Sequence, residues 1–207
     1  MAAKAPLPAA ACKSRMASVC RALSPRELPR LAALATHRRS EAGQALFHEG
    51  DPAEDVFTLT EGSLKLYKLL ADGRRQIMGF LFPGDYLGLA VSRAYVCSAE
   101  ALAPVTVCRF PRRPFMRLLD EFPALEKELL DRASSELAAA QEQMLLLGRK
   151  TARERVASFL VSMAERQSGE GAAPVDLPMN RADIADHLGL TIETVSRTLT
   201  GLRGERL

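Results

Sequence analysis

Residues 180–203 constrain the fold of this chain more than any other segment, because they read as two short helices joined by a tight turn. Asn180 and Thr191 are suitable N-caps for the first and second helix. Gly189 lies between the helices, where a tight turn needs a residue that tolerates positive φ. The predicted helices run over 181–188 and from Ile192 to about Leu202.

The spacing of three residues in this segment is typical of a helix-turn-helix. Counting from Arg181, the fifth residue is the small Ala185, the ninth is Gly189 and the fifteenth is the β-branched Val195. These are the places where the two helices touch, turn and lock together. The predicted core of the motif consists of Ile184, Leu188, Val195 and Leu199.

The outward face of the second helix carries polar side chains that suit the base edges of a DNA major groove. Glu193, Ser196 and Arg197 stand at i, i+3 and i+4, so they share one face. Arginine can bridge guanine O6 and N7, glutamate can accept from cytosine N4, and serine can contact either kind of group. Thr191 and Thr194 are expected to contact phosphates. The alternative is that Glu193 and Arg197 form an ordinary exposed ion pair on a surface helix.

Charge does not decide between these two interpretations. The chain carries a formal net charge of +3, and residues 150–207 hold eight Lys/Arg and eight Asp/Glu. Affinity for DNA would therefore come from individually placed contacts rather than from a basic field.

Residues 41–112 read as short strands at regular spacing. Apolar and polar residues alternate over 56–60 and 63–67, and Gly-containing pairs punctuate the segment at turn positions. Further strands are predicted over 76–81, 96–102 and 105–110. Asp72-Gly73 is the best hairpin signal, and Arg74-Arg75 beside it reads as a solvated turn. The pattern predicts a small antiparallel barrel or sandwich.

Helices are predicted on both sides of this strand region. Ser24 to Glu27 reads as a capping box with Pro25 at the first helical position, followed by a short helix to about Leu34. A second helical region follows Pro114, and Pro123 opens a long helix over 124–147. Gly148 to Lys150 marks a break, after which 152–167 is amphipathic.

The long helix has an uncharged apolar seam at heptad spacing. The seam consists of Leu130, Ala133, Leu137, Ala140, Met144 and Leu147, with charged residues elsewhere on the helix. Spacings of three and four residues in alternation are typical of a dimer helix in a parallel coiled coil. The alternative is a core helix packed against its own domain.

Other sequence features exclude several classes of protein. No apolar run is long enough to span a membrane, and the N-terminus lacks the apolar region of a signal peptide, so a cytoplasmic protein is expected. The four cysteines do not form a disulfide scaffold in a chain of 207 residues. The three histidines, His37, His48 and His187, are scattered, and no catalytic arrangement or phosphate-binding glycine loop is recognisable, so an enzyme is not expected.

Three segments resemble the Crp/Fnr family of bacterial regulators. They are LPMNRADIADHLGLTIETVSRTLTGL in the helix-turn-helix, LYKLLADGRRQIMGFLFPGDYLGL in the strand region and MLLLGRKTARERVASFL at the break that follows the long helix, which it spans. The Glu-x-x-Ser-Arg pattern at Glu193, Ser196 and Arg197 resembles the Fnr/FixK branch.

The resemblance implies an α+β fold with an N-terminal antiparallel β-roll, a jelly roll like that of cyclic-nucleotide-binding domains. A long dimerisation helix and a C-terminal winged helix would follow. The implied parts are a cysteine-bearing arm over 1–25, the β-roll over 26–122, the dimerisation helix over 123–148 and the DNA-binding part over 149–207. The implied function is a transcription regulator that acts in oxygen- or redox-responsive gene control. It would bind a TTGAT-N4-ATCAA-like palindrome in double-stranded DNA as a homodimer, and contact RNA polymerase.

The sequence departs from the family at its ligand positions. Cyclic-nucleotide-binding members carry Gly-Glu-Leu and Arg-Ser where this chain has Gly88-Leu89-Ala90 and Cys97-Ser98, so no cyclic nucleotide is expected. Oxygen-sensing members hold a [4Fe-4S] cluster with four cysteines. Cys12 and Cys20 match the last two of the three N-terminal cysteines, Cys108 matches the cysteine of the barrel, and Ala9 stands at the first position. Cys97 is either a replacement ligand for a [4Fe-4S] cluster or a small buried strand residue.

The sequence ends soon after the second helix of the motif, at Leu207, so the wing that follows it in the family is expected to be missing. A competing hypothesis is therefore a sensor whose shortened head no longer binds DNA and which acts through protein contacts or is inactive.

Overall fold

The computed structural model describes residues 19–89, 93–167 and 175–204, which divide into two compact units. The first unit comprises residues up to Lys68 together with Met78–Ser134. The second comprises Leu69–Ile77 together with the chain from Ser135 onward. Cys12, and Ala9 at the position of a missing ligand, lie outside the described residues.

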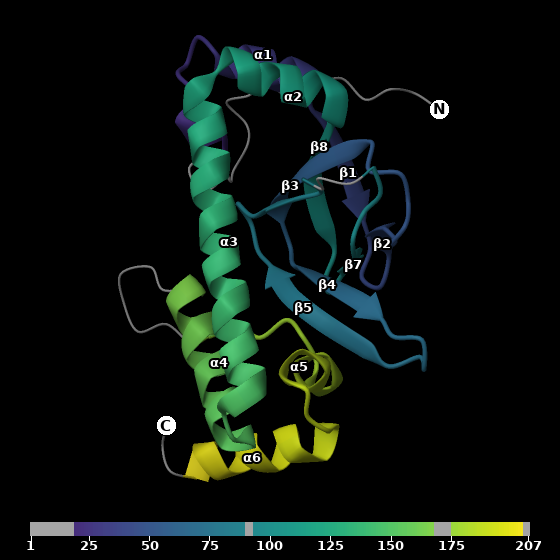
Figure 1. Cartoon of the computed structure of the whole chain (residues 1–207), viewed down its shortest axis with the longest axis vertical. Coiled ribbons are helices and arrows are strands. Elements are labelled where there is room, and N and C mark those ends of the chain that lie inside the picture. Colours follow the sequence, from purple (N-terminus) through teal and green to yellow (C-terminus); the bar gives the residue numbers. More distant parts are fainter. Residues whose placement is uncertain (1–18, 90–92, 168–174, 205–207) are drawn as a thin grey trace. The chain divides into compact units, whose positions relative to one another are not determined.

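The strand region forms two four-stranded sheets (Figure 1), which confirms the predicted antiparallel β architecture. One sheet has the order β1 (Thr36–Ser40), β8 (Val105–Pro111), β3 (Asp55–Glu61) and β6 (Tyr86–Leu87). The other has the order β2 (Ala45–Phe47), β7 (Ser98–Ala101), β4 (Leu64–Leu69) and β5 (Arg75–Leu81). The Asp72-Gly73 turn joins β4 to β5 as predicted, with Gly73 at φ 84°. The predicted strand 96–102 is shorter, and β1, β2 and β6 were not predicted individually.

The first unit is held together by two clusters of buried apolar side chains. One cluster lies among the strands and includes Leu59, Leu64 and Val107. The other joins Phe110 of β8 to the helices α1 (Leu28–Leu34), α2 (Arg112–Glu121) and the start of α3 (Pro123–Arg149). Burial of these side chains is the main favourable term for a fold of this kind.

The starts of two helices differ from the sequence predictions. Helix α1 begins at Leu28 rather than directly after Ser24, because Pro29 is tolerated only in the first turn of a helix. The Glu27 carboxylate instead accepts a hydrogen bond from the Ser24 amide at 2.8 Å, one turn earlier. Helix α2 begins at Arg112, before Pro114, which again occupies the first turn.

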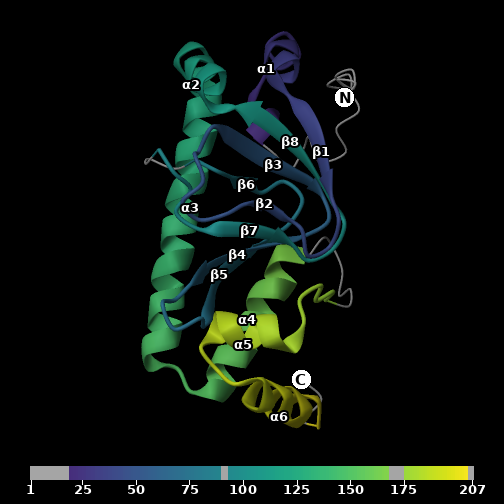
Figure 2. The same cartoon turned by 90° about the vertical axis from the view of Figure 1, so that its right-hand side faces the viewer.

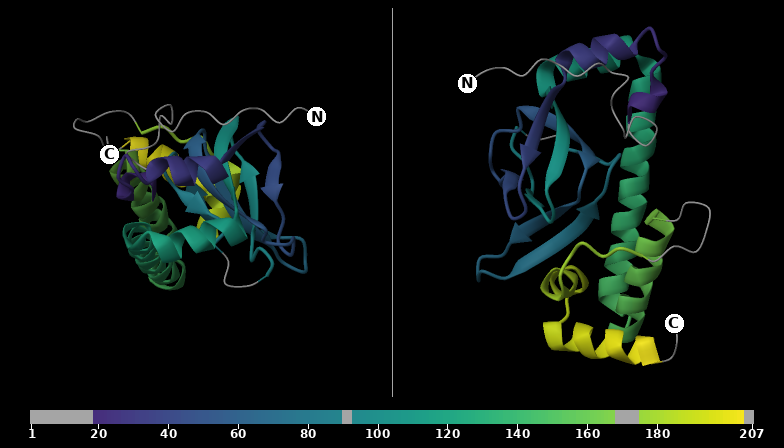
Figure 3. Two further views of the ribbon diagram at one scale, coloured as in Figure 1. Left: turned by 90° about the horizontal axis from the view of Figure 1, so that it is seen from above. Right: turned by 180° about the vertical axis from the view of Figure 1, so that it is seen from behind.

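The second unit is mainly helical. It contains the hairpin segment 69–77, the part of α3 from Ser135, α4 (Ala152–Gln167), α5 (Arg181–Leu188) and α6 (Ile192–Gly204). Helix α4 runs beside the end of α3 in both the front and back views (Figure 1, Figure 3). Helix α5 is seen end-on in Figure 1 and α6 lengthwise, so the chain changes direction sharply between them; Figure 2 shows α6 below α5. The predicted bounds of α4 and α5 are confirmed, and α6 extends two residues beyond its prediction.

No helix within the described residues is sufficiently long and apolar to cross a membrane.

Candidate nucleic-acid interface

The first helix of the motif, α5, begins with the capping arrangement that the sequence indicates. The Asn180 side chain accepts a hydrogen bond from the Asp183 amide at 2.8 Å, and the Asp183 carboxylate accepts one from the Asn180 amide at 3.4 Å. This reciprocal pair satisfies amide groups that a helix start otherwise leaves without partners. The cap therefore fixes where α5 begins.

The turn between α5 and α6 depends on Gly189. This residue has φ 62° and ψ 42°, the left-handed region in which a side chain is strained. Its amide and that of Leu190 both donate to the Ala185 carbonyl. The turn thus closes α5 within two residues and sends the chain into α6.

A small buried core holds α5 and α6 together. Ile184, Ala185, Leu188 and Val195 are buried, as the spacing predicted. Leu199 is only half-buried, and Leu202 one turn later is buried. The core thus extends further along α6 than the sequence pattern indicated.

The polar side chains of α6 lie outside this core. Glu193 and Arg197 are exposed and Ser196 is half-buried. The pKa of Glu193 is lowered by a hydrogen bond from its own amide, by the Thr191 hydroxyl and by the nearby Arg197 charge. The carboxylate is therefore ionised at neutral pH and accepts hydrogen bonds only.

Both threonines at the start of α6 are engaged in the cap. The Thr191 hydroxyl accepts from the Thr194 amide at 3.2 Å, and the two hydroxyl oxygens lie 3.0 Å apart. Their oxygens keep further acceptor capacity at the positively polarised end of the helix. Thr191 is exposed and Thr194 half-buried, which leaves them accessible to a phosphate.

Arg155 at the start of α4 is a structural residue that the sequence analysis missed. Its guanidinium donates to three backbone carbonyls, those of Leu147, Lys150 and Leu188, at 2.8 to 2.9 Å. These carbonyls belong to the ends of α3 and α5, where helices leave acceptors without intrahelical partners. Arg155 therefore ties α4 to both helix ends, although no local pattern marks it.

The apolar seam of α3 is largely exposed in the single chain. Leu130 is 65% exposed, Leu137 61% and Met144 65%, while Leu147 is half-buried. Ala133 and Ala140 are also exposed. A core helix would bury these side chains. Their exposure therefore favours the interpretation of α3 as a dimer helix that packs against a second copy of the chain.

The cysteines do not form one ligand set within the described residues. Cys108 is buried on β8, with its sulfur 3.4 Å from His37 Nε2, and Cys20 packs at the edge of the same apolar cluster. Cys97 precedes β7 in the other sheet, and burial together with Glu49 raises the pKa of its thiol. A ligand to iron must be a thiolate. Among the described residues no three His, Cys, Asp or Glu side chains are grouped to hold a metal.

The donor set therefore does not fit a [4Fe-4S] cluster, which uses four thiolates. Cys12, Cys20 and Cys108 supply at most three. Cys97 directly precedes β7, which lies in a different sheet from the β8 strand that carries Cys108.

The positions that correspond to a cyclic-nucleotide site also lack charged ligands. Gly88 has φ 91°, and a Cβ at this position would lie 2.9 Å from the Asp55 carbonyl oxygen. Glycine is therefore needed here because the two backbone segments lie too close for a side chain. Leu89 is partly exposed and apolar, and the Ser98 hydroxyl accepts a hydrogen bond from the Glu49 amide. A ribose and a cyclic phosphate would find neither a carboxylate nor a guanidinium at these positions.

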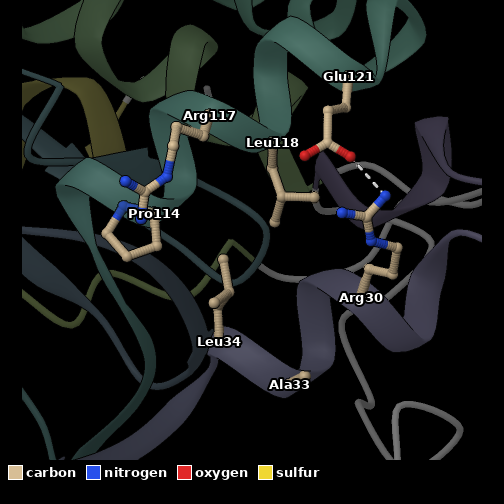
Figure 4. Close-up of a pocket in the computed structure, with 7 residues that line it drawn as sticks. All are labelled: Arg30, Ala33, Leu34, Pro114, Arg117, Leu118 and Glu121. Atoms are coloured by element: carbon tan, nitrogen blue, oxygen red, sulfur yellow. Dashed lines mark ion pairs between the residues drawn. The ribbon is translucent and has the colours of Figure 1, made fainter.

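A pocket of about 320 Å³ lies between α1 and α2 (Figure 4). An ion pair between Arg30 and Glu121 crosses it, and the Arg30 guanidinium also stacks on Phe122. The lining is Arg30, Ala33, Leu34, Pro114, Arg117, Leu118 and Glu121. Because the polar groups do not converge on one point, nothing in this pocket specifies a ligand.

Family models match both parts of the chain. Residues 37–122 match the cyclic nucleotide-binding domain, and residues 154–207 match the Crp-like helix-turn-helix domain.

Curated proteins resemble nearly the whole chain. The transcriptional activatory protein AadR of Rhodopseudomonas palustris is 49% identical over 198 residues, which are 95% of this chain and 83% of that protein. The nitrogen fixation regulation protein FixK of Bradyrhizobium diazoefficiens is 46% identical over 193 residues, 92% of this chain and 81% of that protein. The transcriptional activator protein FnrL of Cereibacter sphaeroides is 37% identical over 198 residues, 93% and 80% of the two chains.

A solved structure agrees with these relatives. FixK2 from Bradyrhizobium japonicum superposes with a TM-score of 0.78 at 40% sequence identity, covering 83% of this chain and 85% of that one.

Proposed function

The chain belongs to the Crp/Fnr family of transcription regulators, on its FixK-like branch, and we propose that it activates transcription by binding a palindromic promoter site as a homodimer. The observation that carries this proposal is the outward face of α6. Glu193, Ser196 and Arg197 share that face, above a core that is buried without them. A helix of this kind reads bases in the major groove while the preceding helix crosses the DNA backbone.

The chemistry of this face favours a TTGAT-N4-ATCAA-like site. Arg197 is suited to guanine and the ionised Glu193 to cytosine N4, and Ser196 can contact an adjacent base. Thr191 and Thr194 would meet the phosphates and fix the register without reading sequence. Each half-site of the palindrome would receive one α6.

The exposed seam of α3 supports the homodimer. Residues at heptad spacing, with small side chains at Ala133 and Ala140, allow two copies of α3 to approach closely in parallel. We call the helix-turn-helix formed by α5 and α6 the reading head. A parallel dimer relates two reading heads by a twofold axis, as a palindromic site requires. On this basis Leu130, Ala133, Leu137, Ala140, Met144 and Leu147 form the interface.

The family relationship also supports a role in oxygen- or redox-responsive gene control, with RNA polymerase as the protein partner. We do not assign the signal to a [4Fe-4S] cluster or to a cyclic nucleotide, because the side chains at the corresponding positions do not fit either group.

A gel-shift titration of the purified chain against a TTGAT-N4-ATCAA duplex tests the proposal. We expect binding as a dimer, and much weaker binding to a duplex in which one half-site is scrambled. Equal, weak binding to both duplexes would favour a regulator that acts through protein contacts alone.

A further inference from the structure

The hairpin segment between β4 and β5 is tied to the first helix of the reading head. Arg75 donates from Nε to Asp186 Oδ2 and from Nη2 to Asp183 Oδ1, both at 2.8 Å. Residues 69–77 and α5 belong to the same compact unit. We call Arg75, Asp183 and Asp186 the Arg75 cluster. The prediction that Arg75 belongs to a solvated turn was wrong, because its guanidinium pairs with two carboxylates of α5.

The backbone next to the cluster makes a second set of contacts. His187 Nδ1 lies 3.1 Å from the Ile77 carbonyl oxygen, which accepts only, so the imidazole carries its proton on Nδ1. Gln76 Nε2 donates to the His187 carbonyl at 3.3 Å, and Gln143 Nε2 donates to the same carbonyl at 2.9 Å. Burial lowers the pKa of His187, which keeps the ring neutral at neutral pH.

The burial of Asp183 makes Arg75 more than a surface ion-pair partner. The Asp183 side chain is 2% exposed, and its two carboxylate oxygens have different tasks. Oδ2 accepts from the Asn180 amide in the cap of α5, while Oδ1 accepts from Arg75. A buried carboxylate that loses its cation is left with an uncompensated charge. The same side chain therefore sets the start of α5 and its attachment to the hairpin.

We infer that Arg75 is a positioning residue for DNA binding: it fixes α5 to the hairpin 69–77, and through the Gly189 turn it holds α6 in place. This inference rests on the proposed function of α6. Arg75 is the first residue of β5 and belongs, with α5 and α6, to the second compact unit. Fixing the head in this way lowers the entropy that it loses when it binds DNA.

The cluster does not obstruct the DNA-reading face. Glu193 and Arg197 are exposed in the structure in which all of the Arg75 contacts are made. The contacts of Arg75 therefore do not inhibit DNA binding by covering the reading residues, and the affinity measurement below gives the sign of their effect.

The neighbouring Arg74 provides a matched control. It pairs with Asp72 of the same turn, at 2.7 Å, and its side chain is 78% exposed. The substitutions Arg74→Met and Arg75→Met remove the same charge from adjacent positions of one turn. Any effect of overall charge is common to both variants.

The first measurement is amide hydrogen exchange of both full-length variants without DNA. We expect faster exchange over 181–190 and over 69–77 in Arg75→Met, and exchange like that of the unmodified protein in Arg74→Met. Unchanged exchange in Arg75→Met would overturn the inference, whatever the result with DNA. This measurement thus separates failure of the inference from failure of the proposed function, which would appear as absent binding by the unmodified protein.

The second measurement is DNA affinity as a function of salt concentration. We expect Arg75→Met to bind the palindrome about tenfold more weakly. The slope of log K against log salt should not change, because Arg75 positions the head and contacts no phosphate. A residue that contacts a phosphate would lower that slope by about one. Unchanged or tighter binding, or a reduced slope, would contradict the assignment.

Two further variants guard against a simple folding defect. Asp186→Asn removes only the half-exposed partner of Arg75 and should give a smaller loss of affinity than Arg75→Met. The exchanged pair Arg75→Glu with Asp186→Arg should recover affinity relative to Arg75→Glu alone. Absence of recovery, in a variant that unfolds at the same temperature as the unmodified protein, would count against the cluster.

Discussion

The reading head and the β-roll of this protein differ in how many of the family's functional residues they contain. In the head, the cap at Asn180, the turn at Gly189 and the polar face at Glu193 and Arg197 are all present and consistent with one another. In the β-roll, the strands and the core are intact, but Leu89 and Cys97 stand where cyclic-nucleotide-binding members have a carboxylate and an arginine, and Ala9 replaces one of the four cluster cysteines.

The difference shows that a fold and its ligand site are maintained by different residues. The β-roll is stabilised by buried apolar side chains such as Leu59 and Val107, which need only the right size and pattern. A ligand site depends on a few side chains of specific chemistry, and losing one leaves the core unchanged. This comparison predicts that substitutions in the reading head and in the seam of α3 have large effects on DNA binding. It also predicts that the iron–sulfur cluster and the cyclic nucleotide that relatives bind have little effect on the β-roll of this protein.

The seam of α3 should give the largest effect. Leu137→Glu places a charge in the middle of the apolar seam, and two such charges would repel across a parallel dimer. A monomer contacts one half-site only, so we expect affinity for the palindrome to fall by about 10²- to 10⁴-fold. Light scattering after size-exclusion chromatography should show a monomer, and gel shifts give the affinity.

Ala139→Glu is the control for this variant. Ala139 is exposed on α3 and lies outside the seam, so the substitution adds the same charge to a different face of the helix. A dimer that persists in Leu137→Glu would mean that the seam is not the interface, and loss of the dimer in Ala139→Glu would mean that the interface extends beyond it.

Arg197→Ala should have the next largest effect. Loss of a bidentate contact to guanine costs about 1–3 kcal/mol and relaxes the preference for that base pair. Arg203, exposed near the end of the same helix, provides a control of equal charge in Arg203→Ala. Gel shifts on the palindrome and on duplexes substituted at the guanine measure both affinity and specificity. If the two variants discriminate between bases equally well, Arg197 does not read that base.

Protonation of His187 should lower the stability of the folded protein as the pH falls, and this effect should be smaller than the two above. Burial lowers its pKa in the folded protein below the ordinary value near 6.5. The unfolded chain therefore binds the proton first, and stability that is fully present above about pH 6.5 is lost as the pH falls towards the folded pKa. Thermal unfolding between pH 7.5 and 5.5 measures this loss. His187→Gln should flatten the dependence, and the exposed His48→Gln should leave it intact.

The sequence predicted the reading head accurately because its signals are local. Asn180, Gly189 and Thr191 mark the ends of α5 and α6 by their own backbone chemistry, and the observed bounds of α5 equal the predicted ones. The predictions were less accurate where a proline stood close to a helix start, since Pro29 and Pro114 occupy first turns rather than mark breaks.

Long-range contacts escaped the sequence analysis altogether. Arg75 and Asp183 are 108 positions apart, and Arg155 reaches the carbonyl of Leu188 from 33 positions away. Neither arginine differs in local pattern from one on a solvated surface. Their partners are set by tertiary packing, which periodicity and capping rules do not contain.

The last prediction concerns the smallest effects, those of the ligands that relatives use. We expect anaerobically purified protein to contain much less iron and sulfide than one [4Fe-4S] cluster per chain. Cys12, Cys20 and Cys108 supply three thiolates, Ala9 stands at the remaining position, and Cys97 precedes a strand of the other sheet. DNA affinity should then be the same before and after exposure to air.

Calorimetry with cyclic AMP should likewise show no binding. Leu89 stands where cyclic-nucleotide-binding members hold the ribose with a carboxylate, and Cys97 stands where they hold the phosphate with an arginine. A stoichiometric cluster, or tight nucleotide binding, would mean that the β-roll has built its site from other residues, and the contrast with the reading head would no longer hold.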